Sequence, residues 1–519
     1  GVANQMEQAL IGTVNSVCGE ILRRFAFEAG MPPDQQVVDE AQGDVLFYQA
    51  MEQALAGNKP LVRQMNALCH RLQITDQRTK QQLWRQEIKK IVDAARANNQ
   101  SSDDIRSLGK GSADQLLAHF PATSKRKLDG ELLGAVNHAL AAIDTESDTT
   151  KATQDFLAKL SGAQAALIHR RLTWPEWISL SKGKVGAKSR DHVQPIMDIA
   201  VEFPAHPQLQ QDLREFTEQG FAIAADSLAT YQEMKRQKGL IDFVDQEQRL
   251  YHLLDNPAVT DILREELQLL MVDEFQDTSP IQLALFLRLS TLANQVIWVG
   301  DIKQSIYGFR GSDPALMDAV VRRVIEEGNP PEILPYSWRS TPELVAYANN
   351  LFAPAFADTL TAEQVELSPQ RKSLPDQPAV ELWQLQGRRK DQRARALANG
   401  LRDLMESERQ VFDKETEVQR PLEYGDIAIL CRTHANLGEI ANALADAKLP
   451  IRYKRPGLLA TPECCLALAC LRRLIDPLDT LASAEITSLT TCQNPEAWIS
   501  QRMDYLGDQT SKSHTWLEE

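Results

Sequence analysis

The chain contains 519 residues, which corresponds to three or four domains at roughly 100–200 residues each. Hydrophobic residues make up 43% and charged residues 24%, as in globular proteins, which argues against a disordered or fibrous chain. Acidic residues outnumber basic ones by 71 to 56, and the net charge of −15 excludes a protein that coats DNA by bulk charge but not one with a local basic groove.

Signals for membrane insertion or secretion are missing from the sequence. No stretch approaches the roughly 18–20 uninterrupted apolar residues of a membrane span. Residues 1–10 have neither the basic start nor the apolar run of a signal peptide. The seven cysteines are an odd number without a Cys-x-x-Cys pair, so neither a disulfide scaffold nor a zinc ribbon is expected. We therefore expect a protein of the reducing cytoplasm with no membrane partner.

The first half of the chain reads as mostly helical. Apolar residues recur at helical spacing among charged ones in 11–25 and 81–98. Residues 151–200 contain eight Lys or Arg against four Asp or Glu, and they include Trp174 and Trp177. This basic segment fits either a nucleic-acid surface or, as charged runs more commonly do, a solvated helix end and loop.

After residue 266 the pattern changes to short apolar runs separated by helical stretches. The runs have strand length and end in polar residues: 269–272, 296–299, 333–334, 380–385 and 427–431. Helical spacing separates them, as at 281–292 and 342–351, and it returns from 461 onward. The alternation predicts an α/β fold with a parallel sheet, whose ligand sites lie at the carboxyl ends of its strands.

Two adjacent carboxylates follow the first of these predicted strands. Leu-Leu-Met-Val at 269–272 runs into Asp273 and Glu274 and then into Phe-Gln-Asp-Thr. Nucleotide hydrolysis needs this arrangement, because the first acid can hold Mg²⁺ on the β- and γ-phosphates and the second can orient or deprotonate the attacking water. An Asp-Glu pair alone is common in solvated loops, so the interpretation depends on the segments that follow.

The next predicted strand runs into Gly-Asp-Ile-Lys-Gln-Ser-Ile-Tyr-Gly-Phe-Arg-Gly at 300–311. Gln304 leaves this strand end in a position to reach a γ-phosphate or its water. Phe309 and Arg310 can stack on an unstacked base and hold a backbone phosphate, with Tyr307 nearby. Tyr307 and Phe309 also fit a pair of buried aromatic residues.

A third polar segment, Tyr-Ser-Trp-Arg-Ser at 336–340, follows the predicted strand at 333–334. An arginine at this place can neutralise the charge that develops in the transition state of phosphoryl transfer, and Arg339 is the candidate. Trp338 is predicted to be a core residue.

In order and spacing, segments 273–278, 300–311 and 336–340 resemble motifs II, III and IV of superfamily 1 DNA helicases of the UvrD/Rep type. Further segments are similar to the AddA/RecB branch, the helicase–nuclease subunits of recombination machines. They are Ile-Gly-Thr-Val-Asn-Ser-Val-Cys at 11–18, Gly-Leu-Ile-Asp-Phe at 239–243 and Tyr-Gly-Asp-Ile-Ala-Ile-Leu-Cys-Arg at 424–432. Asn15 stands where the family usually has a DNA-contacting histidine.

The resemblance implies a role for each candidate residue. Asp273 would ligate Mg²⁺, Glu274 would activate water, Gln304 would sense the γ-phosphate of ATP, and Arg339 would contact it. The residues implied to contact DNA are Tyr307, Phe309, Arg310 and Asn15. ATP and Mg²⁺ are the implied cofactors. The implied partners are single-stranded and duplex DNA and other subunits of a helicase–nuclease complex.

The resemblance also implies a fold of RecA-like parallel-sheet motor domains, of the P-loop NTPase type, with large helical insertions. The first motor domain (1A) would comprise residues 1–29 and 206–330, with a helical insertion (1B) at 30–205. The second motor domain (2A) would comprise 331–457, and the start of its helical insertion (2B) would comprise 458–519.

The phosphate cradle of such a motor, Gly-x-x-x-x-Gly-Lys-Ser/Thr, does not occur in the sequence. The nearest string, Gly-Lys-Val-Gly-Ala-Lys-Ser at 183–189, has alanine in place of the second glycine and no predicted strand before it, so we reject it. Motifs V and VI and a nuclease motif are also missing. We therefore expect an internal fragment of a longer protein, which by itself hydrolyses ATP negligibly.

The leading hypothesis is part of an ATP-dependent DNA helicase or translocase of 3′→5′ polarity, from a recombination or repair helicase–nuclease of the exonuclease V beta or AddA type. The alternative is a non-motor DNA-binding scaffold subunit of a nuclease complex. Retention of Asp273, Glu274, Gln304 and Arg339 argues against it, because a retired motor has no physical need for this set. An RNA helicase is disfavoured, because Asp-Glu-Phe-Gln-Asp-Thr resembles the DNA-directed branch.

Overall fold

The computed structural model describes residues 9–32, 35–76, 81–144, 146–306, 308, 314–329, 331–372, 377–413, 418–453, 458–477 and 479–490. The chain divides into two compact units, Gly1–Pro331 and Glu332–Glu519. Helices dominate both units, and each sheet among the described residues pairs two strands, in parallel for β1–β2, β3–β4 and β5–β6 and antiparallel for β7–β8. The fold is a helix-rich α/β arrangement with small sheets, which agrees with the predicted class at that coarser level.

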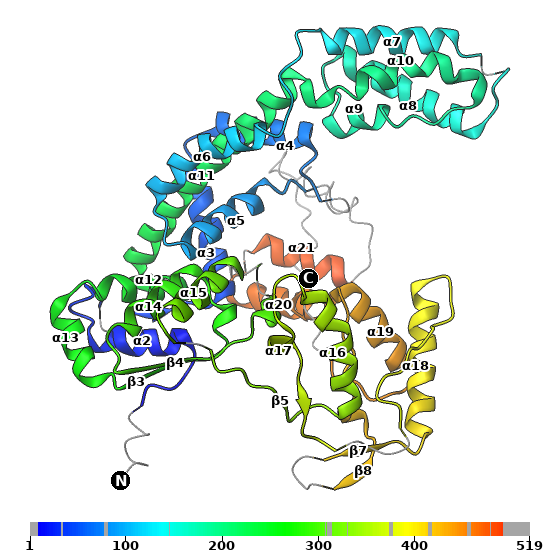
Figure 1. Cartoon of the computed structure of the whole chain (residues 1–519). Helices are drawn as coiled ribbons and strands as arrows, with labels where there is room; N and C mark the ends of the chain where they lie inside the picture. Colours follow the sequence, from blue (N-terminus) through cyan, green and yellow to red (C-terminus); the bar gives the residue numbers. More distant parts are fainter. Residues whose placement is uncertain are drawn as a thin grey trace. The chain divides into compact units, whose positions relative to one another are not determined.

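The first unit contains a long run of helices between its strands (Figure 1). Its elements in chain order are α2 (Val14–Arg24), β1 (Gln36–Val37), α3 (Glu40–Leu55), α4 (Lys59–Leu72), α5 (Trp84–Ala97), α6 (Ser102–Leu117), α7 (Leu128–Ala142), α8 (Lys151–Ile168), α9 (Trp174–Leu180), α10 (Arg190–Ala200), α11 (Pro207–Lys238), β2 (Leu240–Ile241), α12 (Phe243–Leu253), α13 (Pro257–Glu266), β3 (Leu269–Val272), α14 (Pro280–Ser290), β4 (Gln295–Trp298) and α15 (Pro314–Glu326). The helices predicted at 11–25, 81–98 and 281–292 are confirmed as α2, α5 and α14.

Two apolar cores hold this helical run together. In the first core, α11 lies against α3, α5 and α6, and Phe47, Trp84 and Leu228 are buried in it (Figure 1). The second core joins α7, α8, α9 and α10 through residues such as Leu132 and Phe156. Burial of large apolar side chains is the main favourable contribution to such packing, at about 1.5–3 kcal/mol per side chain.

Trp174 and Trp177 belong to the second core rather than to a surface. Their side chains are 8% and 2% exposed. The indole Nε1 of Trp174 donates to Asp212 at 2.9 Å, and that of Trp177 donates to the carbonyl of Ala200 at 3.2 Å. Because both rings are enclosed and both N–H groups have partners, a nucleic-acid surface that uses these two rings is wrong.

The segment at 239–243 turns the chain from α11 into α12 through a buried ionic cluster. Gly239 ends α11 with φ +64°, in the left-handed region that favours glycine. Asp242 then caps α12, and its carboxylate accepts from Lys235 and from the Tyr231 hydroxyl, each at 2.8 Å. Arg96 of α5 pairs with the same carboxylate. Burial alone would raise the pKa of Asp242, but Arg96 and Lys235 hold it far below its usual range.

Strands β3 and β4 lie side by side, in a register that pairs Leu269 with Gln295 and Val272 with Trp298. Helix α14 covers them, and Val272, Phe275 and Leu283 form a core with Met317 of α15. The strands predicted at 269–272 and 296–299 are confirmed, the second of them one residue earlier. Because the two strands are parallel, the segments that follow them leave from the same edge of the sheet.

The second unit combines five helices with two small sheets over its described residues. Its elements in chain order are β5 (Tyr336–Ser337), α16 (Pro342–Phe356), α17 (Ala362–Val365), β6 (Ser368–Pro369), α18 (Lys390–Glu406), β7 (Gln410–Phe412), β8 (Gln419–Pro421), α19 (His434–Asp446), α20 (Pro462–Ile475) and α21 (Thr480–Thr490). Helices α18 and α19 share a core that includes Leu401 and Leu444. The predicted helix at 342–351 and the return to helix from 461 are confirmed over the described residues by α16, α20 and α21.

Three predicted strands and one predicted core residue are wrong in this unit. Residues 333–334, 380–385 and 427–431 lie in no strand. Their apolar composition suits a strand, but a strand also needs a hydrogen-bonded neighbour, and Leu382 is 97% exposed. Trp338 is 73% exposed, because it lies in a bend after β5 ends, where no strand alternation directs the ring inward.

Candidate functional site

The carboxyl end of β3 presents the two predicted acidic residues at the surface of the first unit. Both Asp273 and Glu274 are exposed. Oδ1 of Asp273 accepts from the backbone N–H of Glu274 at 3.0 Å. Glu274 has φ 52° and ψ 39°, a left-handed conformation that costs a non-glycine residue about 1–2 kcal/mol. Such conformations persist where the surroundings impose them, and they cluster at functional sites.

The loop after β4 is organised around Asp301. Its carboxylate pairs with Nζ of Lys303 at 2.9 Å and accepts from Nε2 of Gln304 at 3.0 Å. Burial alone would raise the pKa of Asp301, but hydrogen bonds from Gln304 and Lys303 lower it. The side chain of Gln304, which we predicted to sense a phosphate, is exposed and anchored at one end.

Gln276 connects the two loops, and sequence reasoning missed it. Its Nε2 donates to Oε2 of Glu274 at 2.6 Å, and its Oε1 accepts from the backbone N–H of Asp301 at 2.9 Å. The loops also touch through the backbone, where the N–H of Phe275 donates to the carbonyl of Val299 at 3.1 Å. The structure therefore brings Asp273, Glu274 and Gln304 to one edge of the sheet. The signal for Gln276 was its place within the same motif.

Gly300 allows this close approach of the two loops. A Cβ atom built on Gly300 would lie 2.3 Å from the ring of Phe275 and 2.8 Å from Oε1 of Gln276. Ordinary Cβ contacts are longer than 3.4 Å, so a side chain at this position would push the loops apart. The glycine is therefore required for packing rather than for its backbone freedom.

Asp277 is a second acidic residue that sequence reasoning missed. Its Oδ1 is buried and has no hydrogen-bond partner among the described residues. Partial burial, and then the neighbouring charge of Glu274, raise the pKa of its carboxyl group. A buried carboxylate oxygen without a partner is costly, and a cation bound at this edge would offset that cost.

Asn15 lies in the first turn of α2, close in sequence to the core beneath the site. Val14, the residue before it, packs against the core that contains Val272 and Phe275. Oδ1 of Asn15 is buried and has no hydrogen-bond partner within the described ranges. The segment at 11–18 thus joins the same unit as β3, and Asn15 itself is half-buried.

The remaining predicted residues are not brought to this edge by the described structure. Arg339 belongs to the second unit, where it is exposed. Tyr307, Phe309 and Arg310 lie outside the described residues. In the part of the chain that the structure describes, no group of three or more His, Cys, Asp or Glu side chains could hold a metal ion by itself.

A model of the UvrD/REP helicase N-terminal domain matches residues 2–324, more than half of the chain, and this range contains both loops. The chain belongs to the UvrD/REP helicase family.

Relatives of this helicase-family chain share one name, that of the AddA subunit of an ATP-dependent helicase/nuclease. The protein of that name from Listeria monocytogenes serotype 4b is 23% identical over 568 residues, which cover 93% of this chain and 44% of the relative. The protein from Natranaerobius thermophilus is 27% identical over 300 residues, which cover 49% of this chain and 23% of the relative. The chain is thus of the AddA branch, and it spans less than half the length of these relatives.

The segment at 183–189 of this helicase-family chain has a structural role, as expected from its rejection as a phosphate cradle. It follows helix α9 rather than a strand. The N–H of Gly186 donates to the Thr153 hydroxyl at 2.8 Å, and Ser189 donates to the Asp148 carboxylate at 2.6 Å. A carboxylate at the centre of the loop would repel a phosphate, so the segment does not form an anion site.

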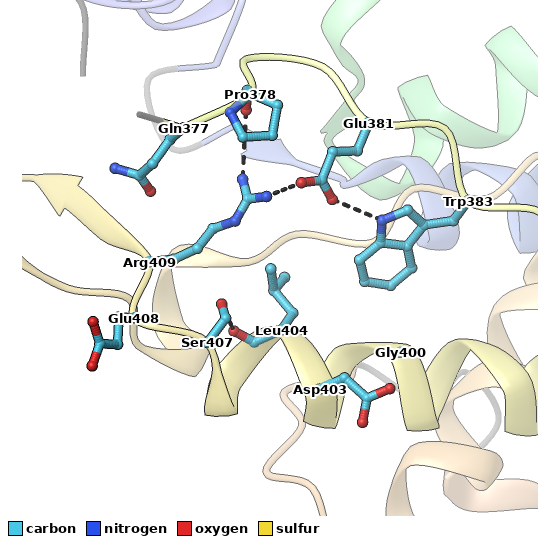
Figure 2. A pocket seen from close by; sticks show the side chains of 10 residues that line it. All are labelled: Gln377, Pro378, Glu381, Trp383, Gly400, Asp403, Leu404, Ser407, Glu408 and Arg409. Atoms are coloured by element: carbon cyan, nitrogen blue, oxygen red, sulfur yellow. Dashed lines mark hydrogen bonds and ion pairs between the residues drawn. The ribbon is translucent and has the colours of Figure 1, made fainter. Parts of the chain in front are cut away.

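A pocket of about 540 Å³ in the second unit contains none of the predicted site residues. Figure 2 shows Glu381 between the guanidinium of Arg409 and the indole of Trp383, and Nε1 of Trp383 donates to it at 2.9 Å. The central polar groups of this pocket thus pair with one another. Separately, none of the described helices combines the length and the apolar character that crossing a membrane would require.

Proposed function

We propose that this chain carries the nucleotide-hydrolysis residues of an ATP-dependent DNA helicase or translocase. The observation that carries the proposal is the hydrogen-bonded set of Glu274, Gln276 and Asp301, at the carboxyl ends of adjacent parallel strands. Ligand sites of parallel sheets lie at this edge. Membership of the UvrD/REP helicase family and the name of the relatives support the same reaction.

Each predicted residue keeps its proposed role. Asp273 would hold Mg²⁺ together with phosphate oxygens and water, which is the usual ligand set of this ion, and bound Mg²⁺ would neutralise phosphate charge. The exposed Asp273 carboxylate and the unpaired Oδ1 of Asp277 fit such an ion. Glu274 would orient and deprotonate water, Gln304 would contact the γ-phosphate of ATP, and Arg339 would stabilise transition-state charge.

The finer parts of the proposal concern DNA and the organisation of the chain. Tyr307, Phe309, Arg310 and Asn15 would contact single-stranded DNA, on which the motor would move 3′→5′. RecA-like motor domains would comprise residues 1–29 with 206–330 and residues 331–457, and helical insertions would occupy 30–205 and 458–519. The physiological setting would be a helicase–nuclease complex with a second protein chain in the cytoplasm, as the name of the relatives suggests.

The experiment is a DNA-stimulated ATPase assay on two lengths of the protein. The 519-residue chain should hydrolyse ATP negligibly, because it contains no Gly-x-x-x-x-Gly-Lys-Ser/Thr segment to hold the phosphates. A longer product of the gene that includes such a segment should hydrolyse ATP, and Glu274→Gln should abolish this activity. Glu265→Gln, an exposed carboxylate of α13, is the matched control and should leave the rate unchanged. Activity of the longer product that survives Glu274→Gln would contradict the role of Glu274.

A non-motor DNA-binding scaffold is the second candidate. The missing phosphate cradle favours it, because binding to DNA does not require one. A scaffold would bind single-stranded DNA with an affinity independent of ATP and Mg²⁺, and no length of the gene product would show ATPase activity sensitive to Glu274→Gln.

A further inference from the structure

The side chain of Gln276 is enclosed between the loops that follow β3 and β4. It is 1% exposed. One end donates to the Glu274 carboxylate at 2.6 Å and the other accepts from the Asp301 N–H at 2.9 Å. A carboxylate can only accept and a backbone N–H can only donate, so a single orientation of the amide satisfies both partners. The chemistry of the two neighbours therefore determines which way the amide points.

Hydrogen bonds continue on the far side of Asp301. Its carboxylate accepts from Nε2 of Gln304 at 3.0 Å. A chain of polar groups thus runs from Glu274 through Gln276 and Asp301 to Gln304, across the gap between the two strands. Each link lies in or at the edge of a partly buried region, where hydrogen bonds are stronger than in water.

Glu274 needs such a support because its backbone is in the left-handed region, with φ 52°. Its side chain is exposed and would otherwise sample several rotamers. The Gln276 amide is the side-chain donor that reaches it from below.

We propose that Gln276 is a positioning residue that holds the Glu274 carboxylate and couples its orientation to the loop of Asp301 and Gln304. Its consequence for hydrolysis depends on the function proposed above, whereas the coupling itself does not. A displacement of Gln304 by a bound phosphate would reach Glu274 through Asp301 and Gln276, so the water-activating group would respond to what Gln304 touches.

The backbone contacts between the loops separate this role from general stabilisation. The Phe275 N–H bonds to the Val299 carbonyl at 3.1 Å, and the Ser305 hydroxyl bonds to the Gln276 carbonyl at 3.3 Å. Neither bond uses the Gln276 side chain. Loss of the amide should therefore leave the loops together and remove only the coupling.

The test is a double-mutant cycle read by hydrogen exchange at the Asp301 amide in the 519-residue chain, without nucleotide. Gln276→Met keeps the length of the side chain and removes both hydrogen-bonding groups. It should raise the exchange rate about fivefold, as expected for loss of one hydrogen bond. Glu274→Ala should raise it severalfold in the wild type, by freeing one end of the amide, and should add nothing to Gln276→Met.

Additive effects of the two substitutions, or no effect of Glu274→Ala at Asp301, would overturn the coupling. Gln282→Met is the matched control, because Gln282 also donates to a carboxylate, that of Glu247 at 2.6 Å, and lies on the neighbouring helix α14. It should leave exchange at Asp301 unchanged.

Gln276→Glu keeps the test decisive where the methionine variant does not fold. A carboxylate at this position still accepts from Asp301 but cannot donate to Glu274. Asp301 should then stay partly protected, and its exchange should no longer respond to Glu274→Ala; a response would contradict the proposal. Absence of ATPase activity in every length of the protein would overturn the function proposed above, while the exchange cycle would still report on Gln276.

Discussion

The Glu247 carboxylate accepts a hydrogen bond from Nε2 of Gln282 at 2.6 Å within the first unit. The pair joins α12 to α14, the helix that covers β3. Glu247 is 3% exposed, and the thiol of Cys18 and the charges of Asp242 and Arg96 act on it. Burial raises the pKa of Glu247 from 4.5 to about 7, although the bond from Gln282 lowers it.

This raised pKa predicts that the first unit loses stability as the pH rises from about 4.5 to 7. The folded state keeps the proton of Glu247 up to about pH 7, whereas the unfolded chain releases it near 4.5. Glu247→Gln should therefore be neutral at pH 4.5 and stabilising above pH 7, by up to about 3 kcal/mol. Thermal unfolding midpoints at pH 4.5, 6 and 8 check this, with the exposed Glu265→Gln as control. An equal shift at all three pH values would contradict the assignment.

The ionic cluster at the start of α12 predicts a large loss from a single substitution. Lys235→Met removes the partner at 2.8 Å from Asp242 and leaves buried negative charge in excess. Removal of one partner of a buried pair costs about 3–5 kcal/mol of unfolding free energy. Arg236→Met is the control, because Arg236 pairs with Glu233 at the surface of the same helix. Denaturant unfolding should show a large loss for the first variant only, and similar losses for both would show that the cluster has no special weight.

Gly300→Ala tests the close contact between the two site loops. The added Cβ would meet the Phe275 ring at 2.3 Å, and overpacking of this kind costs about 1–3 kcal/mol. We expect a lower thermal midpoint and faster hydrogen exchange at Asp301. Gly111→Ala in α6 is the matched control, since no atom lies within 4 Å of its added Cβ, and it should be neutral or stabilising. Tolerance of alanine at 300 would mean that the loops pack less closely than described.

Asp148 predicts a second pH dependence, in the opposite direction and at lower pH. Hydrogen bonds, first from Ser189 and then from Thr150, lower its pKa from 3.8 to about 2. The stabilisation is therefore fully present above about pH 4 and is lost as the pH falls toward 2. Asp148→Asn should lower the midpoint of the helices α7–α10 at pH 7, and the difference from wild type should shrink between pH 4 and 2. Hydrogen exchange in α8 and α10 measures it, and a difference that persists at pH 2 would contradict this role.

Local patterns in the sequence predicted the elements that present the site. The apolar run at 269–272 and the polar residues after it identified β3 with Asp273 and Glu274 at its end, and the same reasoning identified β4 with Gln304 after it. These predictions succeeded because a strand and the residues that follow it are contiguous. The runs at 380–385 and 427–431 carry the same pattern and form no strand, because pairing depends on a neighbour that the run itself does not contain.

The sequence by itself therefore determined that this protein carries the acidic and polar residues of a UvrD/REP-type helicase, and where in the chain they lie. Only the tertiary structure decided how they are held. Gln276 meets Asp301 across 25 positions of sequence, Arg96 meets Asp242 across 146, and Trp177 is enclosed by helices that precede and follow it. Burial and hydrogen bonding act between residues that are close in space, so chain folding assigns partners that periodicity and spacing do not specify.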